Sequence, residues 1–79
     1  MANPKVFDLM DEFIALCKQR GFHKESASVL GIMAGSRAGI ACFGDEETAF
    51  QELIKIAENY TDEQDLLDEY ARKLEPFYK

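Results

Sequence analysis

The sequence predicts a small α+β domain spanning residues 1–79, in which a β-hairpin packs against three amphipathic helices in the order α-β-β-α-α. Three observations lead to this prediction. Apolar residues recur at three- and four-residue spacing in three segments, as in helices with one buried face. A glycine-rich apolar stretch at residues 28–43 lies between them and suits a hairpin better than a helix. The length of 79 residues, with 47% hydrophobic side chains, is enough for one core.

The first helix is expected over residues 4–20 because both of its ends carry capping residues. Asn3 is a good N-cap, and Pro4 suits the first helical position, where its missing N–H removes no hydrogen bond. Lys18 and Arg20 occupy the last turn, and Gly21 provides a left-handed stop. The apolar stripe between these ends consists of Val6, Leu9, Met10, Phe13, Ile14 and Cys17.

Residues 28–43 decide the fold class. The runs 29–34 and 39–43 are short and apolar, and Gly35 and Ser36 between them suit a type II′ turn, which needs a positive φ at its first central residue. The alternative is one long helix, with Ala27, Gly31, Gly35 and Gly39 on a stripe of small residues and an all-α bundle as the result. Three interior glycines would each cost such a helix about 0.8–1 kcal/mol relative to alanine, which favours the hairpin.

A hairpin of this sequence would have two apolar faces, of which the three helices could cover one. The second face would carry Val29, Met33 and Ile40, and both strand edges would stay open. A small core without a disulfide framework also leaves little stability to spare. We therefore expect these three residues to form an interface with a protein partner, most simply with a second copy in a homodimer.

Two more helices are expected in the C-terminal half. Asp45 can cap the first, whose apolar stripe is Ala49, Phe50, Leu53, Ile54, Ala57 and Tyr60. The run Thr61-Asp62-Glu63-Gln64 matches a capping box with Thr61 as the N-cap of the second helix. That helix would bury Leu66, Leu67, Tyr70, Ala71 and Leu74, and it would end before Pro76.

The sequence contains no recognisable catalytic or metal-binding pattern. His23 is the only histidine, and Cys17 lies on the apolar stripe of the first helix, where a packed and unreactive thiol is expected. Cys42 would be buried in the second strand in the same way, unpaired with Cys17. We expect a protein that is not an enzyme and needs no cofactor or metal. Two cysteines, no signal peptide and no membrane-spanning run of apolar residues predict a cytoplasmic chain without a membrane partner.

The charges are unevenly distributed along the chain, which has a net charge of -6. Residues 1–43 carry five basic and four acidic side chains, whereas residues 44–79 carry four basic and eleven acidic ones. No Lys/Arg cluster offers the counterion replacement that nucleic acid binding requires, so a nucleic acid partner is not expected. The expected function is that of a regulatory or interaction module working through protein–protein contacts.

Two other functions are open at this point. The turn from Gly35 to Gly39, with Ser36 and Arg37, could bind a small ligand or anion, because glycine exposes backbone N–H groups and arginine adds a positive charge. The acidic second half could instead mimic a nucleic acid and inhibit another protein by occupying its binding site.

Overall fold

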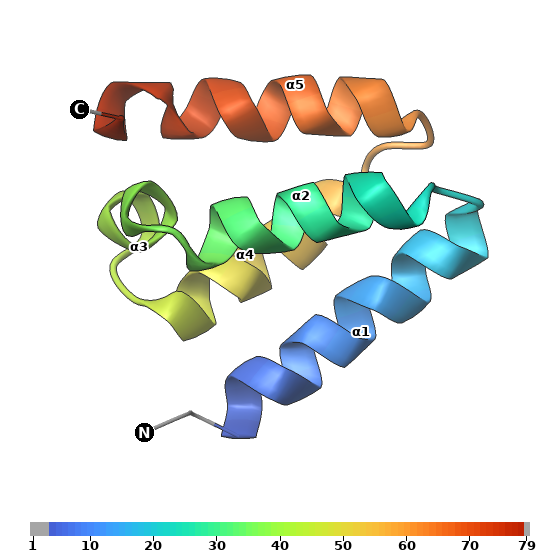
Figure 1. The fold of residues 1–79 in the computed structure, drawn as a ribbon, viewed down its shortest axis with the longest axis horizontal. Coiled ribbons are helices and arrows are strands. Elements are labelled where there is room, and N and C mark those ends of the chain that lie inside the picture. Colours follow the sequence, from blue (N-terminus) through green and yellow to red (C-terminus); the bar gives the residue numbers. More distant parts are fainter. Residues whose placement is uncertain (1–3, 79) are drawn as a thin grey trace.

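The computed structural model describes residues 4–78, and all the regular secondary structure in this range is helical, without a β-strand (Figure 1). The elements are α1 (Pro4–Arg20), α2 (Lys24–Gly35), α3 (Arg37–Phe43), α4 (Glu46–Ala57), α5 (Glu63–Leu74) and the short 3₁₀ helix η1 (Glu75–Phe77). The predicted α+β class is therefore wrong, and the all-α alternative describes the chain.

Residues 28–43 form neither a hairpin nor one continuous helix, because the chain bends by 63° between α2 and α3. Ser36 makes the corner with an extended backbone. Its hydroxyl donates to the carbonyl of Met33 over 2.6 Å and accepts from the Gly39 N–H over 3.2 Å, so one side chain ends α2 and begins α3. No single described helix is long and apolar enough to cross a membrane, and α2 and α3 meet that test only when joined across the bend.

The glycines of this stretch serve close packing rather than a hairpin turn. A Cβ atom at Gly39 would lie 2.5 Å from the carbonyl oxygens of Met33 and Ala34, so only glycine lets α3 approach the end of α2 this closely. Gly35 does not have the positive φ of a type II′ turn. Within residues 4–78, positive φ occurs at Gly21 and Gly44, which both follow helix ends. An interior glycine usually lowers the stability of a helix relative to alanine. At Gly39 this cost does not argue against a helix, because the corner between α2 and α3 has no room for a side chain.

The C-terminal end of α1 has the predicted glycine stop. Gly21 has φ 75°, its N–H donates to the carbonyl of Lys18, and the Phe22 N–H donates to that of Cys17 over 2.9 Å. This hydrogen-bond pair is the Schellman motif. The beginning of α1 at Pro4 is also confirmed, whereas the predicted cap Asn3 lies outside the described residues.

The caps of the two C-terminal helices confirm one prediction and correct another. Asp45 caps α4 by accepting the Thr48 N–H over 2.7 Å, and this bond holds the pKa of its carboxyl below the ordinary value. For α5 the predicted capping box is wrong, because Asp62 is the N-cap and accepts the N–H groups of Gln64 and Asp65. The helix ends at Leu74, before Pro76, as expected.

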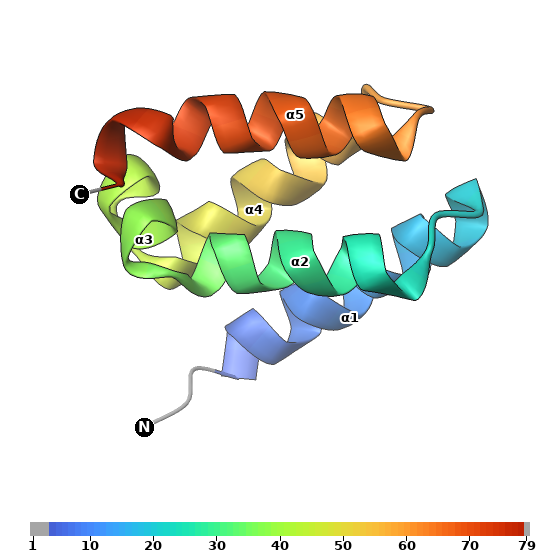
Figure 2. The ribbon, with the colours of Figure 1, turned by 45° about the horizontal axis from the view of Figure 1, so that its top comes forward.

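One core joins the helices, and α2 and α4 are central because each contacts the other four α-helices (Figures 1 and 2). In contrast, α1 packs only against α2 and α4. The ring of Tyr70 on α5 stacks on Phe43 of α3, with centroids 6.1 Å apart. The buried core residues are Val6, Phe13, Cys17, Leu30, Ala34, Ala38, Ala49, Phe50, Leu53, Ala57, Leu66, Tyr70 and Leu74.

Candidate binding groove

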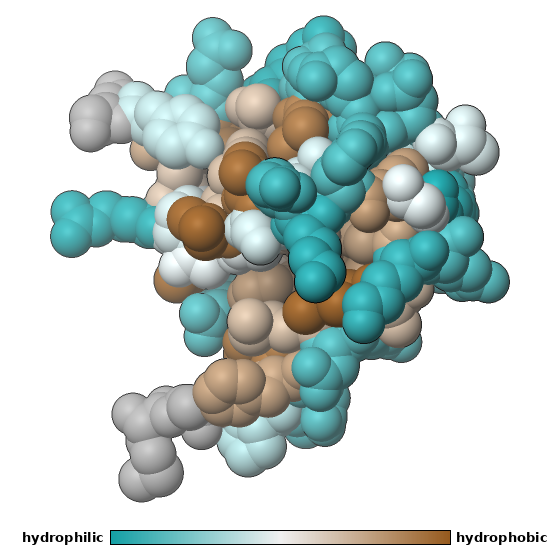
Figure 3. Space-filling view, turned by 45° about the vertical axis from the view of Figure 1, so that its right-hand side comes forward, coloured by the Kyte–Doolittle hydropathy of each residue, from teal (hydrophilic) through white to brown (hydrophobic). Residues whose placement is uncertain are grey.

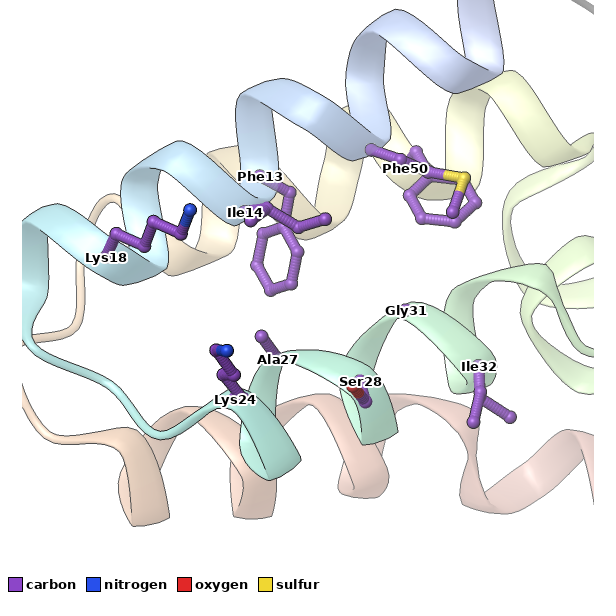
Figure 4. Close-up of a pocket in the computed structure, with 10 residues that line it drawn as sticks. Phe13, Ile14, Lys18, Lys24, Ala27, Ser28, Gly31, Ile32 and Phe50 are labelled. Carbon is purple, nitrogen blue, oxygen red and sulfur yellow. The ribbon is translucent and has the colours of Figure 1, made fainter.

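An apolar groove of about 560 Å³ lies between α1 and α2 and opens to solvent (Figure 4). Met10, Phe13 and Ile14 line it from α1, and Ala27, Ser28, Gly31 and Ile32 line it from α2, while Phe50 of α4 also contributes to its lining. The groove is therefore built from the two helices that diverge in Figure 1 and from the central helix that both of them contact.

The α2 side of the groove is lined by small side chains, which project only a short distance into it. Ala27 and Gly31 lie one turn apart on the side of α2 that faces α1, and Ser28 also lines the groove. A Cβ atom at Gly31 would meet no neighbouring atom within 4 Å, so the space beside this glycine is open. A helix approaches most closely where its partner carries small residues, and this side of the groove leaves room for a further element.

Large aliphatic side chains form the rim of the groove. Ile14 of α1 is 42% exposed and Ile32 of α2 is 72% exposed, which is unusual for isoleucine. Phe7, two turns before Ile14 on α1, is 53% exposed. In the space-filling view, hydrophobic side chains reach the surface between hydrophilic ones (Figure 3).

Two lysines mark one end of the groove. Lys18 from α1 and Lys24 from α2 lie at the end nearest the α1–α2 turn, and Ile32 and Phe50 lie toward the other end (Figure 4). They are the charged residues of the lining, in a protein whose net charge is -6. The groove can therefore hold an apolar surface that carries negative charge at one end.

A second, polar depression of about 580 Å³ lies near the α1–α2 turn and the start of α5. Arg20 occupies it, and its guanidinium donates to the backbone carbonyls of Ala57, Glu58 and Tyr60, where α4 ends. His23 Nδ1 lies 2.6 Å from Glu63 Oε1, and the His23 backbone N–H donates to the same carboxylate. These polar groups join the helix ends to one another, which is a structural role.

The electrostatics of this depression agree with that role. The hydrogen bond to Glu63 raises the pKa of His23, and bonds from Ser26 and His23 lower the pKa of Glu63. Glu63 thus engages both His23 and Ser26 near the start of α2. Burial raises the pKa of the Cys17 thiol, which is 2% exposed and matches its prediction as a packed residue. Among residues 4–78, no three His, Cys, Asp or Glu side chains are grouped to hold a metal ion.

The interface residues predicted from the sequence lie outside the groove. Val29 is 47% exposed on α2, and Met33 one turn later and Ile40 on α3 are half-buried. None of the three lines the groove. The hairpin face that was expected to unite them does not exist, so their role as an interface stays a prediction without that support.

The expected ligand-binding turn is the corner between α2 and α3. Gly35 ends α2, Ser36 uses its hydroxyl for the two helix ends, and Arg37 begins α3 with an exposed side chain. An anion-binding role for this turn stays a prediction. Cys42, expected in a buried strand, is half-buried on α3 and is a free thiol, as is Cys17.

The sequence pattern does not reveal the groove, although it includes several of its residues. It predicts Met10, Phe13 and Ile14 on one buried stripe of the first helix, but that stripe is wider than the surface that α2 and α4 cover. The width of this apolar stripe is the one feature of the sequence that indicates an uncovered surface on the first helix. Comparison of the chain with protein-family models, curated proteins and solved structures finds no match.

Proposed function

We propose that the protein is a non-enzymatic interaction module that binds a helix of a protein partner in the groove between α1 and α2. The observation that carries this proposal is the pair of exposed isoleucines, Ile14 and Ile32, on either side of an apolar groove lined by Phe13 and Phe50. Contiguous exposed apolar surface bordered by polar residues marks interaction sites in soluble proteins.

The shape and lining of the groove favour a helix as its occupant. A groove between two diverging helices offers the i, i+3 and i+4 contacts that an amphipathic helix makes with its apolar face. The small residues Ala27 and Gly31 on α2 permit the approach of a third helix axis to the 8–10 Å that is usual in helix packing. The groove can thus bind a helix without rearrangement of the fold.

The non-enzymatic part of the proposal is supported by the way the polar groups are used. Ser36 caps two helices, Arg20 binds the last carbonyls of α4, and His23 pairs with Glu63 between α2 and α5. Each of these groups stabilises a helix end. We also propose a cytoplasmic location, which the two free thiols of Cys17 and Cys42 support.

Site-specific photo-crosslinking tests the function. Benzoylphenylalanine replaces Ile32 at the groove rim in one variant, and replaces the exposed Asp68 on α5 in a matched control. Both variants are irradiated in the native cells, and crosslinked peptides are identified by mass spectrometry. We expect adducts with a protein, of this chain or another, at position 32 well above the level at position 68. Equal, background-level adducts at both positions would contradict the proposal.

A further inference from the structure

We propose that the helix bound in the groove is α1 of a second copy of this chain, antiparallel to the first α1 about a twofold axis beside Ile14. This inference rests on the proposed function, because it names the partner of the same groove. Three features of α1 support it: an exposed stripe of residues, the distribution of charge along the helix, and the large apolar side chains that the stripe leaves in solvent.

The exposed stripe consists of Phe7, Asp11, Ile14 and Lys18. These residues are spaced by four, three and four positions, so they lie on one face of the helix. All four side chains are exposed. Ile14 and Lys18 line the groove, and Phe7 and Asp11 continue the same exposed face of α1 beyond the lining. A helix that enters the groove and packs along α1 therefore meets all four residues.

Antiparallel pairing brings opposite charges of the stripe together. In a twofold pair, residues at equal distances from the axis face each other, and the midpoint of Asp11 and Lys18 falls beside Ile14. Asp11 of each copy then faces Lys18 of the other copy, so the contact contains this pair twice. Seven residues separate the two positions, or about 10 Å along the helix.

The charges next to the stripe favour the same orientation. The exposed acidic residues Asp8, Asp11 and Glu12 lie in the first half of α1, whereas Lys18 and Lys24 lie at the opposite end of the groove. Only an antiparallel partner places its acidic half against the two lysines. Because each copy has a net charge of -6, an arbitrary contact between copies is repulsive, and this one has local complementarity.

The same register covers the exposed apolar side chains. Ile14 lies at the twofold axis, where it meets Ile14 of the second copy. Phe7 comes opposite the turn that follows α1 in the second copy, at Phe22, which is itself half-buried. Burying such residues supplies the hydrophobic part of the association, and the charge pairs select its orientation.

Charge reversal with mixing tests this arrangement by sedimentation equilibrium in the micromolar range. The wild type is expected to dimerise. Asp11→Lys alone and Lys18→Asp alone each create two like-charged pairs, and each should raise the dimer Kd roughly tenfold or more. An equimolar mixture of the two variants should form a heterodimer with near wild-type affinity, because both cross-pairs are again opposite in charge. Effects within a single chain would not be rescued by mixing.

Glu75→Lys in η1 is the matched control for Asp11→Lys, because it makes the same change in charge on an element that α1 does not contact. Circular dichroism verifies that each variant is folded. A monomeric wild type, single variants that dimerise like the wild type, or a mixture without rescue would each overturn the twofold arrangement. Crosslinks from position 32 to a different protein would then still support the groove as an interaction site, so failure of this inference is distinguishable from failure of the proposed function.

Discussion

A Cβ atom at Gly39 would lie 2.5 Å from two backbone carbonyl oxygens, whereas at Gly35 the nearest atom, Glu46 Oε2, would be 3.4 Å away. The two glycines of one corner thus differ in what they permit. At Gly39 the absence of a side chain allows α3 to approach the end of α2. At Gly35 the backbone has an ordinary negative φ, and a methyl group would make only ordinary contacts.

Gly39→Ala is therefore expected to lower the free energy of unfolding by about 1–3 kcal/mol, the usual cost of forcing an extra carbon into a packed site. Gly35→Ala is the matched control, and it should leave stability within about 1 kcal/mol of the wild type because alanine favours a helix. Urea unfolding followed by circular dichroism measures both. The reverse order, with Gly35→Ala the more destabilising, is what a type II′ hairpin would give and would contradict this corner.

Among the elements, α5 shows how a cap is chosen between two neighbouring residues. Thr61 fits the sequence pattern, but Asp62 makes the hydrogen bonds to Gln64 and Asp65. Glu63, in the first turn, binds His23 instead of the helix start. A carboxylate at the N-cap accepts N–H groups and also interacts favourably with the helix dipole.

Asp62→Ala should consequently destabilise the protein by about 1 kcal/mol, and Thr61→Ala should have little effect. Thermal unfolding of the two variants at neutral pH, beside the wild type, provides the measurement. A Thr61→Ala variant with the larger loss of stability would restore the capping box that the sequence suggested.

The elements that could be predicted from the sequence are those whose ends are determined locally. Pro4, Gly21 and Asp45 each act on hydrogen bonds within a few residues, so the bounds of α1 and the start of α4 follow from the pattern. The corner at Ser36 depends on the approach of two helices, which sequence spacing does not reveal. A hairpin and a bent pair of helices place the same glycines between the same apolar runs.

The groove could not be predicted for a similar reason. Whether Ile14 is covered depends on the angle at which α1 leaves α2, and on the absence of contacts between α1 and α5 or α3. Gly31 leaves space in the groove because it lies on the side of α2 that faces α1. Which side of α2 faces α1 is determined by helix packing and cannot be read from the sequence pattern. The wide apolar stripe of α1 indicates that part of it stays uncovered, but it does not show which residues lack a neighbour.

On the scale of the whole molecule, the proposed function requires that the groove between α1 and α2 is the surface that binds a partner helix. Gly31→Leu tests this requirement because the new side chain would project into open space in the groove. Leucine in place of a helical glycine should also raise the free energy of unfolding, by about 1 kcal/mol. Stability and binding are thus expected to change in opposite directions, which separates the loss of a binding surface from the loss of the fold.

The most direct measurement is the dissociation constant of the complex between the protein and its groove partner, either the second copy proposed above or the protein identified by crosslinking. It is measured for the wild type, Gly31→Leu and the control Ala41→Leu. Ala41 is exposed on α3 and does not line the groove, so its replacement adds a side chain of the same kind elsewhere. We expect Gly31→Leu to weaken binding at least roughly tenfold, a loss of about 1.4 kcal/mol, and Ala41→Leu to bind like the wild type. A stable Gly31→Leu variant with wild-type affinity would contradict the assignment of the groove as the binding surface.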